Sequence, residues 1–136
     1  MSETIAFEQK LLIEIRIGES HERVHAAWRD DTNEGFLICN EINLIFNDQS
    51  IFEIKPCEVE VAGRYPSLSL SVNRIDSTNL HKRFQANDLP MKIKEVVQTD
   101  YLGEDTPNQL EIVLQNASKI IIRHVFPPMT MGIRLE

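Results

Sequence analysis

The chain has 136 residues, 42% of them hydrophobic and 26% charged, a balance that excludes a disordered or fibrous protein and predicts one domain over residues 1–136. Its formal net charge is −7 without any Lys/Arg cluster, so we expect neither nucleic acid nor a membrane as a partner. The sequence lacks an apolar run of about 18 residues and the pattern of a signal peptide, which predicts a soluble, cytoplasmic protein.

Runs of β-branched and aromatic residues, separated by Asn, Asp, Gly and Pro, predict a mainly β, antiparallel fold. The first run shows the alternation of a half-buried strand, because Ile13, Ile15 and Ile17 fall on one face. Such strands indicate an antiparallel β-barrel or β-sandwich. In chain order, we predict strands at residues 11–17, 35–39, 42–46, 51–55, 68–75, 93–99, 110–114, 120–126 and 132–135.

Two other segments lack the pattern of a strand. Residues 77–89 have no period-two alternation and are followed by Pro90, so we predict a short helix around residues 78–87 or a long surface connection. The Pro127-Pro128 pair predicts a turn or bulge before the last strand.

The sequence contains an internal similarity at an offset of 68 residues, half its length. Residues 40–55 (NEINLIFNDQSIFEIK) resemble residues 108–123 (NQLEIVLQNASKIIIR), and each stretch reads as a β-hairpin with Asn or Asp in its turn. One interpretation is a duplication into half-repeats 1–68 and 69–136. The alternative is that two hairpins of an all-β protein merely look alike.

The segment His21-Glu22-Arg23-Val24-His25 matches the H-E-x-x-H pattern of zinc metalloproteases, in which two histidines of one helix bind zinc and the glutamate activates water. Too little chain precedes it for the sheet that such enzymes place before the motif. On a strand, the two histidines would lie about 13 Å apart, too far to share one zinc ion. We therefore expect no bound metal or cofactor, and keep a zinc hydrolase using His21, Glu22 and His25 as an alternative.

Two acidic, glycine-containing segments, 30–35 and 100–105, each precede one of the similar hairpins, and a pseudo-twofold arrangement would bring them close together. The turn at residues 63–66 adds an arginine and an amphipathic aromatic side chain, residue types that anchor protein interfaces. The predicted partner-binding residues are therefore Asp30, Asp31, Glu34, Arg64, Tyr65, Asp100, Glu104 and Asp105.

These features favour a non-enzymatic protein-binding module, for instance an acidic inhibitor or immunity-type protein that blocks a basic partner. The alternative is a β-barrel that binds a small molecule, or a minimal enzyme, since closed β architectures often leave a cavity at one end. The sequence contains no nucleophile elbow, phosphate-binding glycine loop or dinucleotide fingerprint. It leaves the oligomeric state open.

Overall fold

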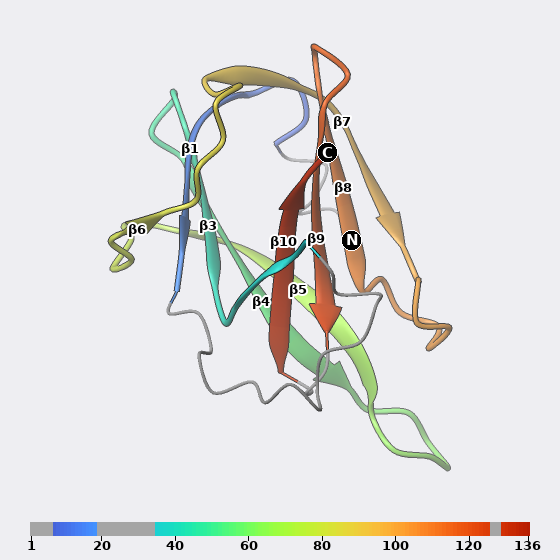
Figure 1. The fold of residues 1–136 in the computed structure, drawn as a ribbon. Coiled ribbons are helices and arrows are strands. Elements are labelled where there is room, and N and C mark those ends of the chain that lie inside the picture. The colour runs from blue at the N-terminus through green and yellow to red at the C-terminus, as the bar shows by residue number, and fades with distance from the viewer. Residues whose placement is uncertain (1–6, 19–34, 126–128) are drawn as a thin grey trace.

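The computed structural model describes residues 7–18, 35–125 and 129–136, and every regular element in these ranges is a β-strand. None of these residues forms a helix that could cross a bilayer. The strands form one antiparallel sheet, which confirms the predicted fold class (Figure 1). Their bounds are β1 (Leu11–Ile17), β2 (Leu37–Cys39), β3 (Ile42–Phe46), β4 (Ile51–Val59), β5 (Ser67–Ile75), β6 (Lys82–Arg83), β7 (Met91–Thr99), β8 (Gln109–Leu114), β9 (Lys119–Val125) and β10 (Thr130–Leu135).

The strand order is β2-β10-β9-β8-β7-β1-β3-β4-β5, with β6 beside β1 and off this path. Within the described residues no pairing joins β5 to β2, so the sheet is open and the closed-barrel alternative is wrong. The sheet instead folds over at the β1–β7 pair, and β4 and β5 lie against β9 and β10 (Figure 1). We call β1, β3, β4 and β5 the first half, and β7 to β10 the second half.

Apolar side chains from both halves fill the space between them and form one core cluster. They reach this space because alternate residues of each strand face the same side of the sheet. At one end of the core, the rings of Phe7, Phe46 and Phe52 contact each other with centroids 5.2 to 5.9 Å apart.

Strand β4 continues four residues beyond the predicted end at Lys55 and includes Pro56. The proline is tolerated because β4 pairs with β3 only as far as Ile54, and beyond that point only β5 lies beside it. Opposite Pro56, the Leu70 amide points away from β4 and donates to the Pro107 carbonyl, 3.2 Å away. Pro56 therefore removes no bond from the β4–β5 ladder.

The predicted helix at residues 78–87 is wrong, since this segment is extended and contains strand β6. It is bonded to β1: the Phe84 amide donates to the Ile15 carbonyl at 2.9 Å, and Arg16 Nη1 donates to the Leu80 carbonyl at 3.1 Å. Phe84 and Leu89 also pack against the core. Tertiary contacts thus determine the conformation of a segment that lacks strong local preferences.

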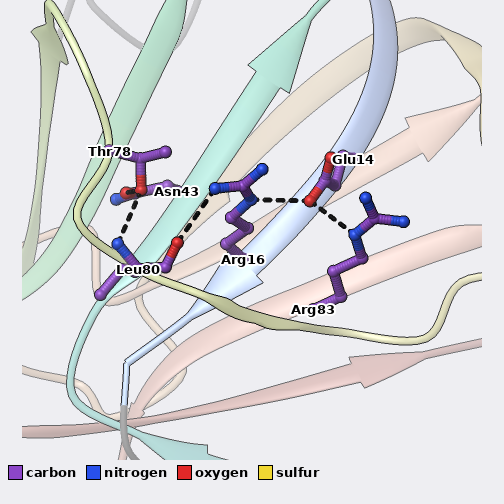
Figure 2. A network of polar contacts seen from close by, with 6 residues as sticks. All are labelled: Glu14, Arg16, Asn43, Thr78, Leu80 and Arg83. Atoms are coloured by element: carbon purple, nitrogen blue, oxygen red, sulfur yellow. Dashed lines mark hydrogen bonds and ion pairs between the residues drawn. The ribbon is translucent and has the colours of Figure 1, made fainter.

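A polar network fastens this segment to the outer face of the first half (Figure 2). The Glu14 carboxylate accepts from Arg16 Nε at 2.7 Å and from Arg83 Nε at 2.9 Å. Thr78 Oγ1 donates to Asn43 Oδ1 at 2.5 Å, and Asn43 is fully buried beneath the segment. The connection between the halves is therefore part of the packed structure.

The two halves share one pattern of strand pairing. The pair Leu12–Phe46 of β1–β3 corresponds to Ile93–Leu114 of β7–β8, and a register shift directly follows each. Further pairs correspond as Ile42–Ile54 to Leu110–Ile122, Ile54–Val72 to Ile122–Ile133, and Cys57–Ser69 to Val125–Thr130. The offset is thus 68 for β3 and β4, 81 for β1 (Leu12 and Ile93) and 61 for β5 (Val72 and Ile133).

The β3–β4 and β8–β9 turns are the most closely matching parts of the two halves. The Phe46 amide donates to the Ser50 carbonyl at 3.0 Å, as the Leu114 amide does to the Ser118 carbonyl at 2.9 Å. Gln49 and Ala117 have positive φ angles of 72° and 73°. In each turn a side-chain oxygen, of Asp48 or Asn116, accepts from the serine amide two residues later.

We expect Gln49→Gly and Ala117→Gly each to raise the free energy of unfolding by about 0.5–1 kcal/mol. A side chain at positive φ is strained, and its relief outweighs the entropy that glycine adds to the unfolded chain. Gln115→Gly, in the same turn as Ala117, should instead lower stability by a similar amount. Urea unfolding of the three variants measures this, and a loss at both positive-φ positions would contradict it.

Candidate functional site

The structure brings together five of the predicted partner-binding residues at one end of the sheet. Arg64 and Tyr65 lie in the turn between β4 and β5, and Asp100, Glu104 and Asp105 lie in the loop between β7 and β8. We call residues 58–68 the finger and residues 100–108 the cross-loop. Asp30, Asp31 and Glu34, and the alternative zinc residues His21, Glu22 and His25, lie outside the described residues.

The finger is the main difference between the β4–β5 and β9–β10 hairpins. Eleven residues lie between the paired residues Cys57 and Ser69, whereas four lie between Val125 and Thr130, the corresponding pair. The longer hairpin projects from the body of the sheet (Figure 1). Since the second half reaches the same pairing with the shorter connection, the fold does not require the additional length.

Arg64 fastens the finger to the cross-loop. Its Nη2 donates to Ser67 Oγ at 2.5 Å and to the Glu104 carbonyl at 2.9 Å. The Glu104 carboxylate in turn accepts from the Leu68 amide at 2.7 Å. The arginine and the acidic loop, which the sequence suggested as separate features, are thus parts of one structure.

Asp100 determines the shape of the cross-loop. Its carboxylate accepts from the Glu104 amide at 2.9 Å, the Asp105 amide at 2.8 Å and Asn108 Nδ2 at 2.7 Å. These bonds, first among them the one from the Glu104 amide, lower the pKa of Asp100, so this residue stays ionised. Asp105 lies at a φ of 62° and its side chain is exposed.

The cross-loop also covers the outer edge of β5. The Leu70 amide and the Ser69 hydroxyl both donate to the Pro107 carbonyl, and the Thr106 hydroxyl donates to the Leu68 carbonyl at 2.7 Å. In the second half, β2 pairs with the corresponding edge of β10, with Cys39 opposite Met131. The cross-loop therefore occupies the place of a neighbouring strand.

His124 lies buried beneath the cross-loop and joins β9 to β5. Its Nδ1 is 2.7 Å from the Ser69 carbonyl, and the Met129 amide donates to its Nε2 at 2.9 Å. These partners require a neutral ring with the proton on Nδ1. Burial accordingly lowers the pKa of His124. Tyr101 from the cross-loop donates its hydroxyl to the His124 carbonyl.

The surface of the site is acidic and carries exposed apolar groups. Tyr65 is 77% exposed and Val59 is 41% exposed. The finger and the cross-loop together contain five acidic residues and one basic residue. Sequence reasoning missed Glu58 and Glu60, because it ended β4 before Pro56; the continued alternation of Val59 and Val61 was the signal available.

The described residues contain neither a metal-ligand cluster nor an activated thiol. No group of three or more His, Cys, Asp and Glu side chains among them is arranged to hold a metal ion. Burial raises the pKa of the Cys39 thiol to about 12, and burial also raises the pKa of Cys57. Both thiols are therefore protonated at neutral pH and poor nucleophiles.

Comparison with protein-family models, with curated proteins and with solved structures finds no match to this chain.

We expect His124 to make the stability of the protein depend on pH. Because the pKa of the ring is lowered on folding, the unfolded chain binds this proton more readily below about pH 6.5. The free energy of unfolding should then fall as the pH drops below this value, by at most about 1.4 kcal/mol per pH unit from this residue.

Denaturant unfolding between pH 5 and pH 7.5 measures the effect, and His124→Gln should remove this part of the pH dependence. His81→Gln removes an exposed imidazole instead and serves as the matched control. If the free energy of unfolding changes with pH equally in the wild type and in His124→Gln, the buried ring takes up its proton in the folded state as well, and the prediction is wrong.

Proposed function

We propose that this protein is a non-enzymatic binding module, an acidic inhibitor or immunity-type protein, and that its partner is a basic protein. The observation that carries the proposal is the exposed Tyr65, held on a finger that the fold does not require and placed next to an acidic loop. Tyrosine supplies a large contact area at a low cost in conformational entropy.

The finger is held in place before any partner binds. Arg64 and Ser67 bond to the Glu104 carbonyl, and the Leu68 amide bonds to the Glu104 carboxylate. A loop fixed in this way loses less conformational entropy on association than a mobile one. These contacts favour Tyr65 as a preorganised anchor.

The charge of the site favours a basic partner. Glu58, Glu60, Asp100 and Asp105 are exposed there, and the whole chain carries a net charge of −7. An acidic patch accelerates encounter with a basic surface and repels acidic competitors. The two unpaired cysteines agree with the reducing cytoplasm as the place of this encounter.

The two alternatives have less support. The filled interior of the open sheet argues against a ligand-binding barrel, and a minimal enzyme has no group of candidate residues among those described. The zinc hydrolase stays a prediction on His21, Glu22 and His25. Elemental analysis of the purified protein would decide it, since a catalytic site needs one zinc ion per chain.

The partner can be sought by immobilising the chain and passing over it an extract of the source cells at low salt. A specific partner should be retained by the wild type, be lost with Tyr65→Ala and be released by added salt. Retention of the same proteins by both chains would contradict the proposal.

For the purified partner, we expect Tyr65→Ala to weaken binding by at least about thirtyfold, the effect of a central aromatic anchor. The fold should be unaffected because the side chain is 77% exposed. Ile13→Ala removes another exposed apolar side chain, on β1, and should leave the affinity unchanged. Isothermal titration measures both, and equal affinities for the two variants would contradict the assignment of Tyr65.

We expect Glu60→Lys to slow association with the partner by about threefold to tenfold at low salt, because it weakens electrostatic steering. Asp76→Lys makes the same change of charge at the opposite end of β5 and is the matched control. Stopped-flow rates at several salt concentrations measure the effect. If both variants slow association equally, net charge and not the site governs the encounter.

A further inference from the structure

Arg123 of β9 contacts aromatic side chains from two separate connections of the chain. Its Cζ lies 4.3 Å from the ring centroid of Tyr101, in the cross-loop. It also lies 4.5 Å from the ring centroid of Phe36, which precedes β2 in the connection between β1 and β3. In the sequence, Phe36 directly follows the acidic segment 30–35. The guanidinium of Arg123 thus lies over one aromatic ring from each connection.

Both sides of this contact are held in place. Arg123 Nε donates to Gln109 Oε1 at 2.8 Å, and Gln109 Nε2 donates to Thr99 Oγ1 at 3.1 Å, which fixes the plane of the guanidinium. Phe36 lies against Gly132, where an added Cβ would be only 3.0 Å from the Phe36 Cβ. The ring therefore approaches the sheet at the one residue of β10 that leaves room for it.

The corresponding position in the first half serves as an internal comparison. Lys55 pairs with Ser71 as Arg123 pairs with Gly132, and its Nζ lies 3.9 Å from Glu41 Oε1, the residue that corresponds to Gln109. Lys55 is exposed, and no cation–aromatic contact joins it to a described ring. A planar, weakly hydrated guanidinium stacks on rings in a way that a compact ammonium does not.

We propose that Arg123 is a positioning residue that couples Phe36 to Tyr101, so that the cross-loop and residues 35–39 are held as one unit. The contacts of Arg123 with the two rings support the coupling without reference to a partner. Its consequence for binding, that the cross-loop meets the partner in a fixed position, rests on the proposed function.

Hydrogen exchange of the full chain without a partner tests the coupling. We expect Phe36→Leu to accelerate exchange severalfold at the amides of Tyr101, Glu104 and Asp105, which are hydrogen-bonded within the cross-loop. Arg123→Met should do the same, and Phe36→Leu should add nothing in the Arg123→Met background. Lys55→Met is the matched control and should leave these three amides as in the wild type.

Two results would overturn the coupling: cross-loop exchange unchanged by Phe36→Leu, or an effect of Phe36→Leu that is equally large without Arg123. Arg123→Lys keeps the charge but removes the planar guanidinium, so it distinguishes stacking from charge. We expect the cross-loop amides of this variant to exchange as fast as those of Arg123→Met. Should Arg123→Met fail to fold, Tyr101→Leu replaces it: accelerated exchange at residues 35–39 supports the coupling, and unchanged exchange there overturns it.

The partner provides a separate readout. We expect Arg123→Met to weaken binding by about threefold to tenfold, as loosened loops must be ordered on association. Loss of binding by Tyr65→Ala with an unchanged affinity for Arg123→Met would overturn the positioning role and leave the proposed function intact. Coupled exchange with no partner captured would instead support the coupling and contradict the proposed function.

Discussion

The strands of the described residues all belong to one antiparallel sheet, and the apolar side chains on its inner face are buried only when the two halves of the sheet face each other. A sheet can bury one of its faces by bending over on itself, and here the sheet bends between β1 and β7. The two strands share only the residue pairs Leu11–Lys92 and Leu12–Met91. Burial between the halves, more than pairing across this short junction, therefore holds them together.

The outer strand of each half, β5 in the first and β10 in the second, is covered by a connection from the other half. The β1–β3 connection provides β2, which pairs with β10. The β7–β8 connection provides the cross-loop, which bonds to β5. Covered edges protect a protein from pairing with other chains. The same need explains why the acidic residues Asp100 and Glu104 form structural hydrogen bonds within and beside the cross-loop.

The strands could be predicted from sequence because period-two alternation is a local signal, and β1 and β3 have the predicted bounds. Local reasoning failed where the surroundings determined the outcome. Pro56 suggested an end to β4, yet it falls where only one neighbouring strand is present. Residues 78–87 became extended because Ile15, Arg16 and Asn43 provide partners for them. The neighbours of Pro56 and the bonding partners of residues 78–87 come from distant parts of the sequence, so neither can be recognised from the local sequence.

The candidate site shows the same division. Arg64, Tyr65 and the acidic residues of the cross-loop were identifiable by type, since aromatic, arginine and acidic side chains in turns are typical of binding surfaces. Their proximity depends on the bend of the sheet between β1 and β7, which places the cross-loop of the second half beside the finger of the first half. Residue types were therefore a guide to the members of the site, whereas its assembly required the topology.

Comparison of the two halves distinguishes the strand pairings that the fold requires from the finger, which it does not require. Pairings that recur in both halves, from Leu12–Phe46 to Cys57–Ser69, are explained by the burial of one shared core. The finger has no such explanation, because the β9–β10 hairpin closes with seven fewer residues. Ordering additional residues costs conformational entropy. The projecting part of the finger exposes Tyr65 and Val59 and so gains little burial in return, which agrees with the proposed contact with a partner.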